Sequence, residues 1–195
     1  MLYLRNTNQI QSLGGGVLRG PAEIPPSPAP TSSLNYYDGL GRTVYNGFIN
    51  PATNPNGFAT AVVFTGPTLD TDVLIPFSSL SVQKSTQWLG YFKASTTETY
   101  TFYLRTDDDS VLWVGGAATA SVLTTGSALL IETTHPDTPN SASISLTSGS
   151  YYPWRLQYAD GLGAQYFTSS FSTPTISETK DYSGYIFANT ASLGF

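Results

Sequence analysis

The feature that most constrains the fold is a strongly alternating stretch that stops at three consecutive aspartates. Apolar side chains recur at every second position, at Tyr100, Phe102 and Leu104. A period of two predicts a β-strand with one buried face. Strand character ends at Asp107–Asp109 and resumes at Val111–Val114. The chain therefore has to place three adjacent carboxylates between two apolar strands.

These carboxylates leave two interpretations open. Like charges at ~4 Å repel by about 1 kcal/mol per pair in bulk water, and by more where water is partly excluded. The loop is therefore either a fully solvated turn or a site whose charge is neutralised by a cation. Calcium is the natural candidate, because it takes 6 to 8 oxygen ligands from carboxylates, carbonyls and water. Asp160, in a later loop, offers a further carboxylate.

The rest of the chain predicts an all-β fold. Short apolar segments bounded by turn residues recur along it, and no segment shows sustained helical periodicity. This pattern is typical of an antiparallel β-sandwich or a closed barrel. Residues 72–77 are a candidate edge strand, because Pro76 cannot donate a hydrogen bond to a neighbour. Residues 117–131 are expected to form two short strands broken at Gly126, with a helix as the alternative.

Composition divides the chain into three parts. Residues 1–33 are rich in glycine and proline, which favours an extended arm or spacer. The short apolar start at Leu2–Leu4 favours an arm that docks on other structural proteins over a purely disordered tail. Residues 34–171 are the predicted β-domain. Residues 172–195 are a C-terminal tail in which YSGYIFA is a candidate for one added strand.

Charge and cysteine content exclude several classes of function. The net charge is −5 with 8 Lys and Arg in 195 residues, which argues against nucleic acid as a partner. No window has the ~18 consecutive apolar residues of a membrane span, so we expect no membrane insertion. The sequence contains no cysteine, and its N-terminal segment lacks the ~7 to 15 apolar residues of a signal peptide. We therefore expect assembly in a cytoplasm and use on a virion or another extracellular particle.

The sequence gives little support for catalysis. The single histidine, His135, lies in a proline-containing loop and has no cysteine partner. A glycosidase needs two carboxylates at a fixed separation, one of them with a raised pKa. Exposed, ion-binding aspartates would have lowered pKa values instead. We therefore expect a protein that is not an enzyme.

Two motifs resemble a known family. The first combines an aromatic strand, an aspartate pair and a Leu-Trp strand that ends in glycines: Gly90-Tyr91-Phe92, Tyr100-Thr101-Phe102, Asp107-Asp108, Leu112-Trp113 and Gly115-Gly116. The second is Tyr-Tyr-Pro-Trp-Arg at residues 151–155, in a strand that continues to Tyr158. Together they resemble the protective-antigen-like domains, and most closely the GLEYA and flocculin branch of fungal cell-surface adhesins. The resemblance covers residues 34–171.

The resemblance implies a calcium-dependent lectin site. In such lectins an adjacent aspartate pair, joined by a cis peptide, binds calcium, and sugar hydroxyls coordinate the ion. The matching pair here is Asp107 with Asp108, or Asp108 with Asp109. The second-loop ligand would be Asp160, where the adhesins usually carry asparagine. The sugar would then meet the short loop that follows, at Gly161, Leu162 and Gly163.

Two functions follow as expectations. The first is a calcium-dependent carbohydrate-binding module of adhesin or lectin type that attaches a particle to a cell-surface glycan. The alternative is a structural subunit, such as a minor capsid, decoration, tail or filament protein, that uses the same fold only for protein contacts. A tyrosine-rich β-domain carried on an arm is also compatible with a homo-oligomer.

Overall fold

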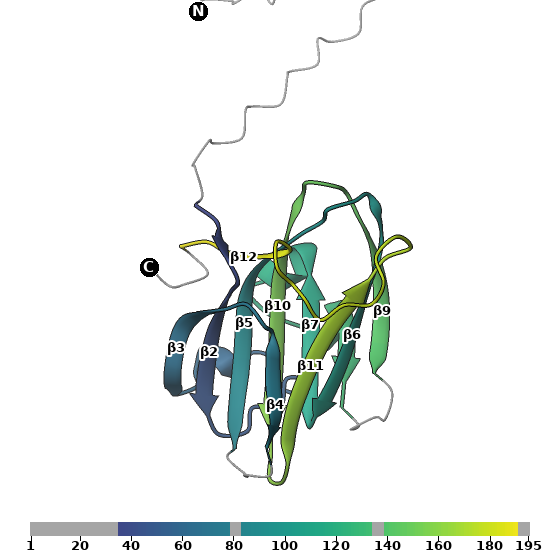
Figure 1. The fold of residues 1–195 in the computed structure, drawn as a ribbon. Helices are drawn as coiled ribbons and strands as arrows, with labels where there is room; N and C mark the ends of the chain where they lie inside the picture. Colours follow the sequence, from purple (N-terminus) through teal and green to yellow (C-terminus); the bar gives the residue numbers. More distant parts are fainter. Residues whose placement is uncertain (1–34, 79–82, 134–138, 191–195) are drawn as a thin grey trace, which may run out of the picture. The chain divides into compact units, whose positions relative to one another are not determined.

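The computed structural model describes residues 35–78, 83–133 and 139–190. The chain divides after Ser33 into two units, and the described residues all belong to the second. This second unit is all-β: its strands are antiparallel and form two sheets, as Figure 1 shows. The predicted antiparallel β-sandwich is thus confirmed. The expectations for residues 1–33 lie outside the described residues.

The larger sheet has eight strands. Its main path runs β1-β12-β5-β10-β7-β8, and β2 joins it beside β5 while β3 pairs only with β2. The strands are β1 (Tyr37–Asp38), β2 (Leu40–Asn46), β3 (Val63–Asp70), β5 (Lys84–Lys93), β7 (Asp109–Val114), β8 (Leu130–Glu132), β10 (Tyr151–Asp160) and β12 (Ile186–Ala188). The strand β12 forms within the segment that the sequence assigns to the tail.

The smaller sheet has four strands in the order β4-β11-β6-β9. They are β4 (Leu74–Ser78), β6 (Glu98–Asp107), β9 (Asn140–Leu146) and β11 (Gln165–Ser172). β4 lies at an edge, where Pro76 costs no ladder hydrogen bond, so the sequence placed this strand correctly. The chain passes from one sheet to the other between β6 and β7 and again between β10 and β11.

The core between the sheets is dominated by aromatic rings. Phe92 lies at its centre, and its ring packs edge-to-face against Tyr100, Phe102 and Phe171 at centroid distances of 5.4, 5.1 and 5.3 Å. Such pairs add about 0.5 to 1.5 kcal/mol to the gain from area burial. Trp88 and Trp154 are buried in this core.

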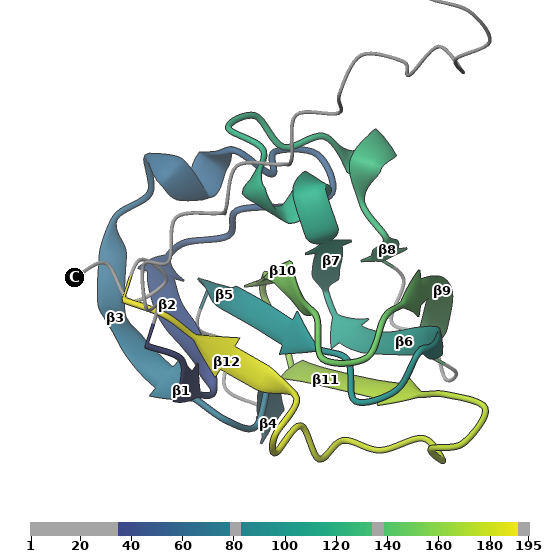
Figure 2. The same cartoon turned by 90° about the horizontal axis from the view of Figure 1, so that it is seen from above.

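A second, smaller core lies on the outer face of the larger sheet, where Trp113 packs with Val111 and Leu123. It is covered by two 3-10 turns, η2 (Gly115–Thr119) and η3 (Thr125–Ser127), which Figure 2 shows above β7. The first of the two strands expected in residues 117–131 is therefore replaced by turns. The physical reason is that the indole N–H of Trp113 donates to the carbonyl of Thr124 at 3.0 Å, which holds this segment over the sheet.

Candidate functional site

The acidic loop is one of the connections between the two sheets. Asp107 is the last residue of β6 in the smaller sheet, and Asp109 is the first residue of β7 in the larger one. The peptide bond between Asp107 and Asp108 is cis, as the family resemblance implies for the first of the two possible pairs. The backbone N–H of Asp108 donates to the carbonyl of Ala159 in β10 at 3.3 Å, so the loop is fixed to that strand.

Strand register brings Asp160 to this loop. β10 pairs with β7, and Ala159 lies opposite Asp109. Asp160 is the next residue and ends β10, so it lies beside Asp108 where the paired strands end. Gly161 and Asp108, which are 53 positions apart in the sequence, also meet at this end of the sandwich.

The carboxylate of Asp160 is buried without a partner. Its exposed fraction is 0%, and neither of its oxygens accepts a hydrogen bond. Lys84 lies directly opposite on β5, but its ammonium donates to Oδ1 of Asn46 at 2.5 Å and lies over the ring of Phe64. Within the described ranges the one salt bridge is elsewhere, between Arg42 and Asp70. A buried and unpaired carboxylate is costly, because desolvation disfavours its charged form.

The pKa values at this site reflect the closeness of the carboxylates. Burial, followed by the negative charges of Asp108 and Asp107, raises the pKa of Asp160 to about 6. Burial, followed by the negative charges of Asp160, Asp107 and Asp108, raises the pKa of the neighbouring Tyr158. The hydroxyl of Tyr158 donates to the backbone carbonyl of Asp107 at 2.8 Å and so supports the loop from inside. The site is therefore a region of concentrated negative potential.

Asp109 is directed elsewhere. Successive side chains of a strand point to opposite faces, and Asp109 shares the outer face of β7 with Val111 and Trp113. There its Oδ2 accepts a 2.6 Å hydrogen bond from the amide of Asn50. The structure thus places Asp107 and Asp108 near enough for their charges to act on Asp160, and it ties Asp109 to the loop that follows β2.

The loop after β10 forms one wall of the site. The backbone N–H of Gly161 donates to Oδ2 of Asp108 at 2.6 Å. Leu162 is 82% exposed, and Phe48 from the loop after β2 is 40% exposed. An added Cβ at Gly161 would lie 3.9 Å from the ring of Phe48, so the two loops are neighbours. Gly163 has a positive φ of 131°, which allows the turn into β11.

Within the described residues, no three His, Asp or Glu side chains are grouped closely enough to hold a metal ion by themselves. A hard cation here would therefore also need carbonyl, amide or water oxygens. No described helix is long and apolar enough to cross a membrane.

Comparison with known proteins shows which family this geometry resembles. Residues 84–173 match the model of the GLEYA domain family. The resemblance to GLEYA domains is confirmed. The matched segment contains the acidic loop, Asp160 and the loop that follows it. No curated protein matches the chain.

Solved structures agree with this GLEYA-like fold. A subtype-switched Epithelial Adhesin 9 A domain from Candida glabrata, in complex with beta-lactose, has a TM-score of 0.62 at 17% identity, covering 79% of this chain and 89% of that chain. The Epithelial Adhesin 6 A domain of the same organism, in complex with Galb1-3GlcNAc, has a TM-score of 0.62 at 13% identity, covering 79% and 88%. An anti-sigma factor domain-containing protein from Clostridium clariflavum has a TM-score of 0.59 at 16% identity, covering 78% and 47%. At these identities the likeness shows the fold.

Sequence reasoning missed two residues that shape the site. Asn50 holds Asp109, and its Oδ1 also accepts hydrogen bonds from the backbone N–H groups of Ala52 and Thr53. Lys84 faces Asp160 in register without pairing with it. The Asn-Pro dipeptide at positions 50 and 51 is a turn signal that could have indicated the first. No local pattern could have indicated the second.

Proposed function

We propose that the GLEYA-like domain binds a cell-surface glycan through a calcium ion held by Asp107, Asp108 and Asp160. The observation that carries this proposal is the carboxylate of Asp160, fully buried, without a hydrogen-bond partner, and adjacent to two other carboxylates. A folded protein tolerates such a group when a cation neutralises it. The donors near the loop are oxygens rather than sulfur or imidazole, which suits calcium.

Bound calcium would supply a positive centre that sugar hydroxyls can coordinate. The residues of this chain would shape what reaches it. Gly161 and Gly163 leave the approach open because they carry no side chain, and Leu162 and Phe48 offer exposed apolar surface to a sugar face. The Epithelial Adhesin structures with the same fold are complexes with galactose-containing sugars. We extend sugar binding to this chain, without assigning a particular glycan and without enzymatic activity.

Calcium titration tests the proposal. Chelator-treated protein is titrated with calcium by calorimetry, and the titration is repeated with Asp108→Asn and Asp160→Asn. Asp72→Asn is the matched control, because Asp72 is exposed and lies far from Asp160. Asp72 comes just after β3, whose last residues pair with the start of β2, whereas Asp160 lies opposite Lys84, which pairs with the end of β2. We expect binding in the wild type and the control and its loss in both site variants. Binding that survives in Asp160→Asn would place the ion elsewhere.

Glycan binding is tested separately. A glycan array is probed with the full chain in calcium and again in chelator. Calcium-dependent binding to a defined set of sugars supports the lectin function. Calcium binding without any bound glycan would leave the ion as a structural element.

A second candidate is a structural subunit, and the edge strand β3 favours it. This strand is exposed along most of its length, and among the described strands it pairs only with β2. Val62 beside it is 70% exposed, and Val63 and Phe64 are also exposed. An exposed apolar edge can pair with another chain. Light scattering of the full chain and of Val62→Glu tests this function: an oligomer that dissociates in the variant supports it, and a wild-type monomer contradicts it.

The place of action is part of the proposal. An acidic domain that recognises glycans would act on an extracellular surface, and we propose the surface of a virion or another particle. Immunolabelling of intact particles tests this location, and labelling confined to the interior of particles or cells would contradict it.

A further inference from the structure

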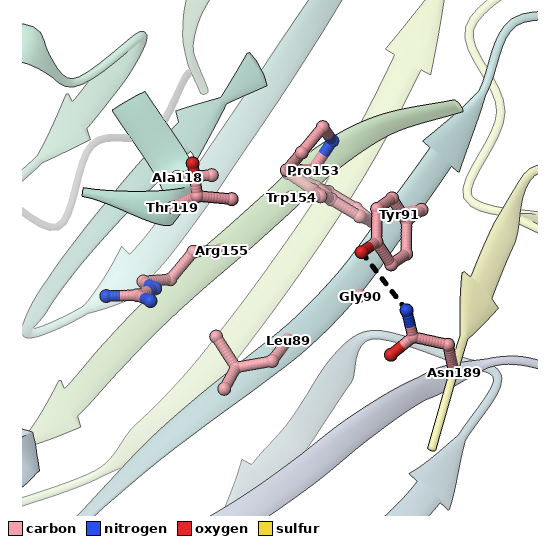
Figure 3. Close-up of a pocket in the computed structure, with 9 residues that line it drawn as sticks. All are labelled: Leu89, Gly90, Tyr91, Ala118, Thr119, Pro153, Trp154, Arg155 and Asn189. Atoms are coloured by element: carbon pink, nitrogen blue, oxygen red, sulfur yellow. Dashed lines mark hydrogen bonds between the residues drawn. The ribbon is translucent and has the colours of Figure 1, made fainter. Parts of the chain in front are cut away.

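Two hollows meet on the outer face of the larger sheet, away from the acidic loop. The first, drawn in Figure 3, is lined by Tyr91, Thr119 and Asn189 among others. The second is lined by Tyr45, Phe58, Gln87, Ser121 and Gln157 among others. Arg155 lines both hollows. It lies on β10 between Trp154 and Leu156, whose side chains belong to the inner core, so it points to the opposite face.

The guanidinium of Arg155 is without an anionic partner. The side chain is partly buried, and its Nε–H is fully covered and donates to no described acceptor. Among the described residues it forms no hydrogen bond or ion pair, the salt bridge there being Arg42 with Asp70. Burial lowers the pKa of Arg155, yet a guanidinium stays charged at neutral pH. A charge in such a place is normally paired.

The second hollow also holds an unpartnered acceptor. Gln157 is 1% exposed, and its amide donates to the carbonyl of Pro55 at 3.0 Å and to Oε1 of Gln87 at 2.9 Å. Its own Oε1 is covered from solvent in the structure and has no hydrogen-bond partner. Buried amide oxygens are almost always hydrogen-bonded. A ligand here would therefore need an anionic group for Arg155 and a hydrogen-bond donor for Oε1 of Gln157.

The first hollow fits this requirement less well. Its polar pair is already joined, because the amide of Asn189 donates to the hydroxyl of Tyr91 at 3.1 Å. Figure 3 shows the guanidinium of Arg155 pointing away from these two side chains. The second hollow has a volume of about 360 Å³, within the ~300 to 1,000 Å³ typical of small-molecule sites. Its apolar wall is Tyr45 packed edge-to-face on Phe58 at 5.3 Å.

We propose that the second hollow binds an acidic sugar of the uronic acid class. Arg155 takes the carboxylate, and Oε1 of Gln157 accepts a hydrogen bond from a sugar hydroxyl. A planar guanidinium matches a carboxylate in two-point geometry. An inorganic sulfate would satisfy Arg155 but would bring only acceptor oxygens toward Gln157. A hydroxylated carboxylate satisfies both residues at once.

Titration of the full chain with sodium glucuronate tests this site. Sodium acetate is the probe for the carboxylate contact with Arg155, and glucose is the probe for the hydroxyl contact with Gln157. We expect glucuronate to bind more tightly than either probe, and Arg155→Gln to lose at least tenfold in affinity. Asp160→Asn and added chelator should leave glucuronate binding unchanged, because the site shares no residue with the acidic loop. The glucuronate proposal and the calcium proposal can therefore fail independently, and the two failures can be told apart.

Three results would overturn the proposal: no glucuronate binding at millimolar concentration, equal binding of glucose, or binding unaffected by Arg155→Gln. Removing an unpaired buried charge should not lower the melting temperature of the variant. If Arg155→Gln nevertheless fails to fold, Arg155→Lys replaces it. The lysine keeps the charge but loses the two-point geometry, so we expect weakened binding; unchanged affinity would contradict the role of Arg155.

Discussion

The backbone N–H of Gly161 donates a 2.6 Å hydrogen bond to Oδ2 of Asp108, and this bond joins the loop after β10 to the loop between β6 and β7. The missing side chain at position 161 makes the approach possible, because a Cβ there would lie 2.7 Å from the same oxygen. The bond therefore fixes one carboxylate of the candidate site, and it depends on a glycine.

Gly161→Ala is expected to weaken calcium binding at least tenfold. The added methyl group displaces the carboxylate of Asp108, whereas the backbone at Gly161 has no positive φ that alanine would strain. Calorimetry of the chelator-treated variant measures the effect. The control is Gly126→Ala, where an added Cβ meets nothing within 4 Å. Equal calcium affinity in both variants would show that the position of Asp108 does not matter for the ion.

Asp160 predicts how stability depends on pH in chelator. Its pKa of about 6 in the folded protein exceeds the ordinary 3.8, so between these values the folded state holds a proton that the unfolded state releases. Stability from this group is therefore present below about pH 4 and is lost as the pH rises through about 6. Asp160→Asn should accordingly be more stable than the wild type at pH 7, by on the order of 1 kcal/mol.

Thermal melts at pH 4 and pH 7 measure this effect. We expect the variant to melt roughly 2 to 4 °C above the wild type at pH 7 in chelator, and no difference at pH 4. Added calcium should raise the melting temperature of the wild type at pH 7 and leave Asp160→Asn unchanged. A variant that is less stable than the wild type at pH 7 in chelator would mean that the carboxylate has a partner in the folded protein.

The sequence predicted the sheet class and the acidic loop because both depend on local pattern. Period-two alternation identified β6, and the motif around Trp113 left two possible aspartate pairs, Asp107 with Asp108 or Asp108 with Asp109. The burial of Asp160 depends on where β10 pairs with β7, and the direction of Asp109 depends on the face of β7. Neither can be obtained without the register of the strands. The turns over Trp113 were missed for a similar reason, since a tertiary hydrogen bond to Thr124 decides the conformation there.

Asp109→Asn is expected to leave calcium affinity unchanged and to reduce stability by about 1 kcal/mol. Its carboxylate accepts a 2.6 Å hydrogen bond from Asn50 on the outer face of the sheet, and a single hydrogen bond contributes about 0.5 to 1.5 kcal/mol. Urea unfolding measures the stability, and calorimetry measures the affinity. Asn50→Ala should be more destabilising, because Asn50 also accepts from Ala52 and Thr53. Loss of calcium binding in Asp109→Asn would make Asp109 a ligand instead.

Phe92→Ala tests whether the aromatic core holds the two sheets together. The ring of Phe92 on β5 contacts Phe102 and Phe171 of the smaller sheet, and its side chain is fully buried. Removing it leaves a cavity between the sheets, so we expect a loss of about 3 to 5 kcal/mol in urea unfolding. Phe77→Ala is the control, because Phe77 is 71% exposed and should change stability by less than about 0.5 kcal/mol. A loss below about 1 kcal/mol for Phe92→Ala would mean that the core closes around the missing ring.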